Sequence, residues 1–319
     1  MGYSQNALDL RKLRTIELPR LSDRISYLYF DRTRIIQDRT GVIAIQESDG
    51  ATRIIRIPIA SIGFLLLGPG TSISAPAAIS LHRAGTVVMF TSEGGVTGFA
   101  MARPLTGRAD WMQAQARCWV NPEARLLAAK KLYARQFNDE NIDPEIPLRV
   151  LRGIEGSRVK TLYQNLSKKH HLKAWRRETD PEKYTDPVNP LLNLGSAILY
   201  GAALTAVGAL GLTPSLGFIH NGASNALFFD LADIYKTHSS IPLAFSCSQY
   251  PDGSARLRTE MRRYLFEHNV MEAMLDLLVD ILFDYLEPAE NRRGDKLTDE
   301  SGFVDGHTNY GHVDSGLKE

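Results

Sequence analysis

The sequence predicts an α+β fold, with an N-terminal β-strand domain over residues 1–104 and a larger all-α domain over residues 105–289. Short β-branched and aromatic runs are confined to the first hundred residues, whereas apolar residues recur at three- and four-residue spacing after Asp110. The chain has 319 residues, 44% hydrophobic and 23% charged, and this length suits one large domain or two. These figures exclude a collagen-like repeat and general disorder.

Five runs in the first part predict strands, separated by Gly- and Pro-containing turns: residues 25–30, 41–45, 53–57, 86–90 and 96–99. The Ala-rich segment 74–84 predicts a short helix within this strand region. Three longer periodic segments predict helices after the domain boundary: residues 124–137, 148–166 and 256–286. Residues 290–319 contain few apolar side chains, and we expect them to form a disordered polar tail.

Residues 187–229 contain no Asp, Glu, Lys or Arg. Their length alone would suit a membrane span. However, the densest part, residues 194–212, is mostly Gly, Ala, Ser and Thr, and Pro214 then ends the run. A helix buried on all sides at the centre of the helical domain is therefore the preferred interpretation, with a membrane span as the alternative.

Charge and cysteine content restrict the setting of the protein. Thirty-seven Lys and Arg residues against 36 Asp and Glu give a net charge of +1, so only local charge can indicate a partner. Cys118 and Cys247 have no CxxC spacing, which favours a reducing compartment, and no signal peptide is expected at the N-terminus. Walker A, dinucleotide-binding, HExxH and serine-hydrolase motifs are absent from the sequence.

Glu155 lies within the apolar arc of the predicted helix 148–166, together with Arg158. One interpretation is an ordinary i,i+3 ion pair on the shoulder of the helix. The other is a carboxylate held in a cleft as a metal ligand.

A second group of candidate residues surrounds the turn at Asn221-Gly222. His220 precedes this turn, and Asp230 and Asp233 share one face of the helix predicted after it. Taken separately, these are more typical of a satisfied core histidine and solvated carboxylates. Taken with Glu155, they form an oxygen- and nitrogen-donor set that suits Mg²⁺ or Mn²⁺ at a phosphodiester better than it suits zinc.

Nine Lys and Arg residues lie between Arg149 and Arg177, and Glu155 is the only acidic residue among them. A run of charge is often only a solvated face. Because this segment also carries the candidate metal carboxylate, it equally predicts a surface for a polyanion. Its candidate DNA-binding residues are Arg158, Lys168, Lys169, Lys173 and Arg176.

Four sequence motifs together resemble the large, universal adaptation protein of CRISPR systems. They are Arg152-Gly-Ile-Glu-Gly-Ser-Arg158, Tyr200-Gly201, Gly217-Phe-Ile-His-Asn-Gly222 and Asp230-Leu-Ala-Asp-Ile-Tyr-Lys236. The segments 18–26 and 60–71 are similar to the subtype I-E branch of that family. The likeness extends to about Leu286.

The resemblance implies a metal-dependent DNA integrase and endonuclease of spacer acquisition in the prokaryotic cytoplasm. It implies a homodimer, a small ferredoxin-like adaptation protein as partner, and both a short protospacer duplex and leader-repeat DNA as substrates, without a membrane. It assigns the metal-ligand roles to Glu155, His220 and Asp233, with Asp230 as a supporting catalytic residue. It places Tyr200, Lys236 and Arg256 among the DNA-contacting groups.

The implied reaction is attack of a DNA 3′-hydroxyl on a phosphodiester at the repeat boundary, with one Mg²⁺ or Mn²⁺ ion polarising the phosphate. His220 acts as a ligand in this scheme, and a general-base role is the alternative. Two other functions remain open: a non-catalytic DNA-binding scaffold and a metal-dependent nuclease of DNA repair.

Overall fold

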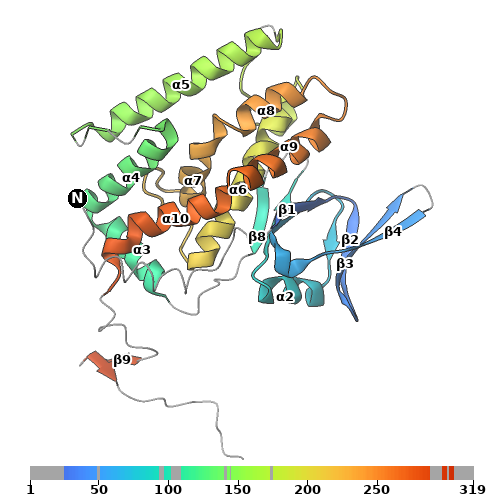
Figure 1. Cartoon of the computed structure of the whole chain (residues 1–319), viewed down its shortest axis with the longest axis horizontal. Helices are drawn as coiled ribbons and strands as arrows, with labels where there is room; N and C mark the ends of the chain where they lie inside the picture. The colour runs from blue at the N-terminus through green and yellow to red at the C-terminus, as the bar shows by residue number, and fades with distance from the viewer. Residues whose placement is uncertain are drawn as a thin grey trace, which may run out of the picture.

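Two four-stranded sheets form the N-terminal part of the protein (Figure 1). The computed structural model describes residues 25–48, 51–92, 97–101, 109–139, 142–143, 145–172, 175–287, 297–299 and 302–304. The first sheet has the order β1 (Ile25–Phe30), β5 (Ile62–Leu67), β7 (Val87–Thr91) and β8 (Thr97–Met101). The second has the order β4 (Ala51–Arg56), β3 (Gly41–Ser48), β2 (Thr33–Asp38) and β6 (Ser72–Ile73). Helix α2 (Ala75–Arg83) follows β6.

The first sheet lies between two hydrophobic cores. Strands β1, β5 and β7 are parallel, and strands of this kind are normally covered on both faces. On β5, Leu65 and Leu67 pack into the core of the strand domain, whereas Phe64 and Leu66 pack into the core of the helical domain. The sheet therefore fixes the strand region against the helices.

Most of the described chain after β8 is helical: α3 (Asp110–Val120), α4 (Pro122–Phe137), α5 (Leu148–Lys169), α6 (Val188–Leu210), α7 (Ala226–Lys236), α8 (Ser240–Cys247), α9 (Gly253–Glu267) and α10 (Val270–Leu282). Short 3-10 turns lie at Ile59–Ser61, Pro181–Lys183 and Phe283–Tyr285. The predicted α+β fold, with strands first and helices after, is confirmed.

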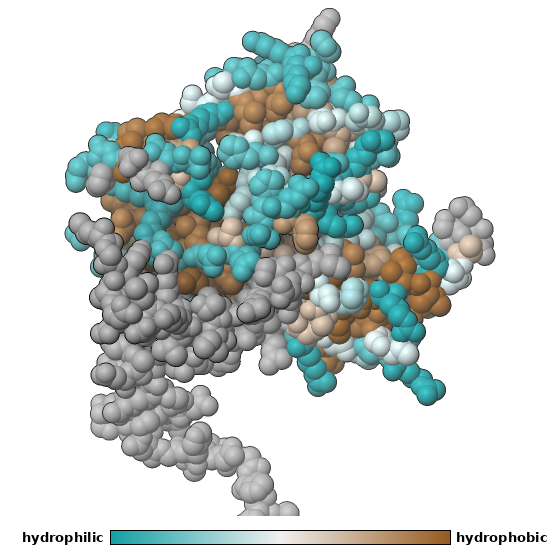
Figure 2. All heavy atoms as spheres, viewed as in Figure 1, coloured by the Kyte–Doolittle hydropathy of each residue, from teal (hydrophilic) through white to brown (hydrophobic). Residues whose placement is uncertain are grey.

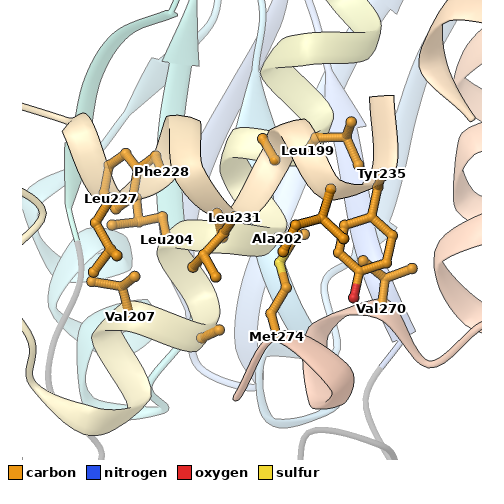
Figure 3. Packing of buried hydrophobic residues seen from close by; sticks show 14 of the residues in the cluster. Leu199, Ala202, Leu204, Val207, Leu227, Phe228, Leu231, Tyr235, Val270 and Met274 are labelled. Carbon is orange, nitrogen blue, oxygen red and sulfur yellow. The ribbon is translucent and has the colours of Figure 1, made fainter. Parts of the chain in front are cut away.

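Helix α6 is the centre of the helical domain. It is long and apolar enough to cross a membrane, but 83% of its most apolar 18-residue window is buried inside the protein. Figure 3 shows Leu227, Leu231 and Tyr235 of α7 packed with α6 and with Met274 of α10. The interpretation of this segment as a core helix is confirmed, and α7 is anchored to it along its apolar face.

The sequence prediction differs from the structure at several strands and at one long helix. Strands β2, β5 and β6 were not predicted, nor were two short strands at Leu297–Asp299 and Gly302–Val304. The single helix predicted over residues 256–286 is wrong, because the chain forms α9 and α10 with a break at Asn269, where φ is +46°. Asparagine adopts this left-handed conformation more easily than most residues, while the apolar pattern alone continues across it.

The predicted domain limits remain predictions. The boundary after residue 104 falls within residues 102–108, which lie outside the described residues. The predicted tail, residues 290–319, also lies outside them except for β9 (Leu297–Asp299) and β10 (Gly302–Val304), which pair antiparallel.

The contact between α6 and β5 provides a test of this packing. A Cβ atom added at Gly201 would lie 2.4 Å from Cε2 of Phe64, whose ring is fully buried. Overpacking costs about 1–3 kcal/mol, and the gain in helix propensity of Ala over Gly offsets about 1 kcal/mol of it. We therefore expect Gly201→Ala to lower the free energy of unfolding, by up to about 2 kcal/mol, in urea denaturation.

Gly153→Ala on α5 is the matched control for this substitution. Nothing lies within 4 Å of a Cβ atom added there. Only the helix-propensity gain then applies, so the free energy of unfolding should rise by about 0.5–1 kcal/mol. An equal gain from Gly201→Ala would contradict the tight α6–β5 contact.

Candidate active site

The buried carboxylate of Asp230 organises the loop that precedes α7. Its side chain is fully buried. Oδ2 accepts hydrogen bonds from the backbone N–H groups of Phe218 and Ile219, at 2.6 and 3.0 Å. Oδ1 accepts from the backbone N–H of His220 at 2.9 Å and lies 2.8 Å from Nδ1 of the same residue. Asp230 therefore holds both the backbone and the ring of His220.

This arrangement leaves Nε2 of His220 directed to the next turn of α7. Nε2 lies 3.9 Å from Oδ2 of Asp233. The hydrogen bond with Asp230 raises the pKa of His220, although burial acts in the opposite direction. When the imidazole is neutral, the bond from Nδ1 fixes the tautomer, and the lone pair then lies on Nε2.

Asp233 is oriented from its other side by Lys236 and Tyr200. Nζ of Lys236 lies 2.6 Å from Oδ1 of Asp233 and donates to the Tyr200 hydroxyl at 3.1 Å. Burial alone would lower the pKa of Lys236, but Asp233 and Tyr200 raise it overall, so the ammonium group stays charged. Lys236 and Tyr200, predicted to contact DNA, thus border the same group of residues.

Glu155 on α5 faces helix α4. Its Oε2 accepts a hydrogen bond from the Tyr133 hydroxyl at 3.0 Å, and its Oε1 accepts one from Nε2 of Gln136 at 2.9 Å. The alternative ion pair with Arg158 does not form in the described part of the protein. The Arg158 guanidinium instead lies over the Phe137 ring, 4.3 Å from its centroid.

Gln136 joins the two halves of the site. The same Nε2 atom that donates to Glu155 also donates to the backbone carbonyl of Asp233, at 3.2 Å. A second link runs from the Arg152 guanidinium on α5 to the carbonyl of Ile219, next to His220. Glu155, His220 and Asp233, which lie far apart in the sequence, are therefore held around one junction of α4, α5 and α7.

Sequence reasoning missed Tyr133, Gln136 and Arg152 as parts of this site. Tyr133 and Gln136 lie three residues apart on the buried face of α4 and are only 0 and 7% exposed. A glutamine on the apolar face of a helix is the signal that could have identified them, because a buried amide needs polar partners. Arg152 was counted in the basic segment and stands in the Arg152–Arg158 motif, but it was given no part in the site.

The donor groups at the junction suit a hard divalent ion. Two carboxylates and one imidazole are available, and the histidine donates its second ring nitrogen to a buried carboxylate, as metal-bound histidines commonly do. Within the described part of the chain, Glu155 accepts hydrogen bonds from the neutral side chains of Tyr133 and Gln136, one on each oxygen, and each oxygen retains an unused lone pair. Among the described residues, no three His, Cys, Asp or Glu side chains lie close enough together to form a metal-binding group.

The basic residues divide into exposed and internally paired groups. Lys168, Lys169 and Arg176 are exposed. Figure 2 shows that mostly hydrophilic side chains cover the upper edge of the molecule, over α5. Arg256 is also exposed, but its guanidinium lies 2.7 Å from Asp252 and over the Tyr250 ring. Lys173 lies outside the described residues.

The aromatic residues within the basic segment belong to the core. Tyr163 and Trp175 pack against each other and against the buried ring of Phe245. Arg177 bonds with the side chains of Asn189 and Asn193. These residues fix the segment after α5 to the helical domain.

A cavity of about 670 Å³ opens beside Lys236 and Tyr200. Its lining is mixed, with the charged groups of Arg177 and Lys236, the side chain of Asn193 and the ring of Phe229. The cavity therefore continues the polar surface from Asp233 toward the segment after α5.

Comparison with known proteins identifies relatives of the whole chain. The family described as CRISPR associated protein Cas1 matches residues 138–249, which include Glu155, His220 and Asp233. The CRISPR-associated endonuclease Cas1 2 of Thermus thermophilus is 32% identical over 311 residues, covering 94% of both chains. The CRISPR-associated endonuclease Cas1 of Clostridium sp. SY8519 is 37% identical over 239 residues, covering 74% of this chain and 78% of that protein.

Solved structures show the same fold. The crystal structure of a TtCas1–DNA complex superposes with a TM-score of 0.75 at 29% identity, covering 88% of this chain and 99% of that one. A casposase bound to its integration product superposes with a TM-score of 0.66 at 16% identity, covering 81% and 91%, which is a likeness of fold alone.

Proposed function

This chain belongs to the Cas1 family of CRISPR-associated endonucleases, and from that premise we propose that it is a divalent-metal-dependent DNA strand transferase and endonuclease. In this proposal it inserts short foreign DNA duplexes at a CRISPR repeat boundary, and the same site cleaves DNA when water replaces the 3′-hydroxyl. The names of the relatives support nuclease activity. The residues at the α4–α5–α7 junction support the metal-dependent chemistry.

One observation carries the proposal: Gln136 binds the side chain of Glu155 and the backbone of Asp233 at the same time, while Asp233 faces Nε2 of His220. Two carboxylates and an imidazole thus meet at a junction with basic residues along the adjoining helix. A catalytic metal and a DNA phosphate require these two features together.

Each residue has a distinct part in the proposed reaction. Glu155, His220 and Asp233 would hold one Mg²⁺ or Mn²⁺ ion, which when bound supplies Lewis-acid polarisation of the phosphate. Asp230 fixes the ring of His220. Lys236 holds the Asp233 side chain in its orientation toward that ring. His220 serves as a ligand, since Asp230 occupies its Nδ1 and leaves Nε2 as the lone-pair nitrogen.

The substrates and partners follow the same premise. We propose that the chain works as a homodimer with a small ferredoxin-like adaptation protein, within the subtype I-E branch, in the prokaryotic cytoplasm. Protospacer and leader-repeat DNA would lie along α5, and Arg158, Lys168, Lys169, Lys173 and Arg176 would contact their backbones. Tyr200, Lys236 and Arg256 would contact DNA nearer the reacting phosphate. The crystal structure of a 29% identical relative in complex with DNA supports DNA as a binding partner.

A strand-transfer assay tests the proposal. The full chain is mixed with a short duplex bearing free 3′ ends and a repeat-containing plasmid, with Mg²⁺ or Mn²⁺ and with or without the small partner. We expect joined products at the repeat boundary that disappear when EDTA removes the metal and return when excess metal is restored. Unchanged joining in EDTA would contradict the metal site.

Two other results would favour the alternative functions. DNA binding without joining would indicate a non-catalytic DNA-binding scaffold. Cleavage of branched DNA without repeat preference would indicate a repair nuclease.

The exposed lysines at the end of α5 allow a separate test of DNA binding. Each phosphate contact contributes about 0.9 to the slope of log affinity against log salt concentration. We therefore expect the double variant Lys168→Gln/Lys169→Gln to reduce that slope by up to about 2, measured by fluorescence anisotropy with duplex DNA. Lys131→Gln is the control, because its ammonium group already pairs with Asp280 on α10. Equal slopes for the wild type, the double variant and Lys131→Gln would contradict the proposal that the end of α5 contacts DNA.

A further inference from the structure

Glu155 is attached to the site mainly through helix α4. Only Leu151 and Leu166 are buried among the 22 residues of α5, and the helix lies along the outside of the molecule (Figure 1). The other side chains of α5 that pack against the core, Leu148, Val159, Leu162 and Tyr163, are only partly buried, and they fix the helix rather than the carboxylate of Glu155. Hydrogen bonds from neighbouring elements must determine where its carboxylate lies.

Helix α4 is well suited to provide a fixed reference. It begins at Pro122, and the Asn121 side chain caps it by accepting from the N–H groups of Glu123 and Ala124. Ala128, Ala129 and Leu132 are buried on the face that also carries Tyr133 and Gln136. The two polar side chains thus project from a helix that is fixed in the core.

Tyr133 and Gln136 hold one carboxylate oxygen of Glu155 each. Two donors on separate oxygens fix the plane of the carboxylate as well as its position. Burial raises the pKa of Tyr133, and the charge of Glu155 raises it further, so the hydroxyl remains a donor. Both donors are neutral, so they orient the carboxylate without cancelling the charge that would attract a cation.

Gln136 also reaches across to α7. Its second hydrogen bond, to the Asp233 carbonyl, fixes the separation between the backbone of one proposed ligand and the side chain of another. Asp233 itself is held by Lys236, a charged partner, so Glu155 is the ligand whose orientation depends on neutral hydrogen bonds.

We propose that Gln136 and Tyr133 are positioning residues that set the orientation of Glu155 and its distance from Asp233, and thereby the affinity of the site for its divalent ion. The proposal rests on the function proposed above. Residues that orient metal ligands typically change metal affinity by about 10- to 100-fold when they are replaced. Gln136 has the larger role of the two, because it contacts both sides of the site.

Direct Mn²⁺ binding by the full chain tests this role independently of catalysis. Free Mn²⁺ is measured by electron paramagnetic resonance during titration of the wild type, Gln136→Met and Tyr133→Phe. Methionine preserves the volume of Gln136 without its hydrogen bonds, and Tyr133→Phe removes one hydroxyl only. We expect Gln136→Met to weaken Mn²⁺ binding by about tenfold or more and Tyr133→Phe by less, while Lys131→Met on the same helix binds as the wild type does.

Melting curves in EDTA separate positioning from folding. A purely structural role would lower the metal-free melting temperature and leave Mn²⁺ affinity within about twofold of wild type, which would overturn the proposal. If Gln136→Met does not fold, the result for Tyr133→Phe decides, since an unchanged affinity there would also overturn it. Glu155→Ala is the reference: if it binds Mn²⁺ like wild type, the proposed metal site fails and the inference with it. Loss of binding in Glu155→Ala alone would refute only the positioning role.

Discussion

Glu155→Ala is expected to abolish DNA strand transfer while leaving duplex binding at equal salt unchanged. Loss of a ligand removes metal stabilisation of the reacting phosphate, which is worth several kcal/mol. Because each 1.36 kcal/mol corresponds to a factor of ten in rate, joining should fall by at least about a thousandfold. The initial rate of product formation at saturating Mn²⁺ measures the effect, and fluorescence anisotropy measures DNA binding.

The fold should tolerate this substitution. Glu155→Ala removes two hydrogen bonds; Gln136 keeps its bond to the Asp233 carbonyl, and the buried Tyr133 hydroxyl that loses its acceptor costs about 1–3 kcal/mol. Glu182→Ala is a suitable control, because Glu182 is exposed and lies in a short 3-10 turn after the basic segment. Full joining activity in Glu155→Ala would contradict the catalytic role of this site, and the DNA-binding scaffold would then be the remaining interpretation.

Local sequence patterns predicted most elements of the fold but missed the central strand. The run Ile62–Leu67 is apolar at every position except Gly63, so it has no alternation that would mark a strand. The structure explains this pattern, because β5 is buried between two cores and needs apolar side chains on both faces. A short apolar run of this kind fits a buried strand and a buried helix equally well. The elements that pack against it in the fold decide between the two.

The candidate site was predicted as a set of residues, whereas its construction came from the structure. The motifs singled out Glu155, His220 and Asp233, but no spacing in the sequence shows that Gln136 bridges two of them. Charge was the less reliable guide. Arg152 and Arg177 were counted with a basic surface, yet both have partners within the protein, because a charge run does not reveal which side chains are already bonded.

Asp230→Ala should destabilise the fold as well as inactivate it. Its carboxylate accepts from three consecutive backbone N–H groups and from the ring of His220. A buried donor left without a partner costs about 1–3 kcal/mol, so the free energy of unfolding should fall by about 3 kcal/mol or more. The urea midpoint should decrease while the m-value stays constant, since the surface exposed on unfolding is nearly the same.

Asp252→Ala provides the matched comparison, because that carboxylate forms an exposed pair with Arg256 on α9. An exposed ion pair contributes at most about 1 kcal/mol, so its midpoint should barely move. Equal midpoints for the two variants would show that the loop before α7 holds His220 without Asp230. A large difference, together with the stable but inactive Glu155→Ala, would separate the two carboxylates by role: Asp230 builds the loop that presents the imidazole, and Glu155 acts on the metal. Activity measurements cannot make that distinction, because both substitutions eliminate activity. Stability measurements can, because only Asp230→Ala is expected to lower the free energy of unfolding strongly.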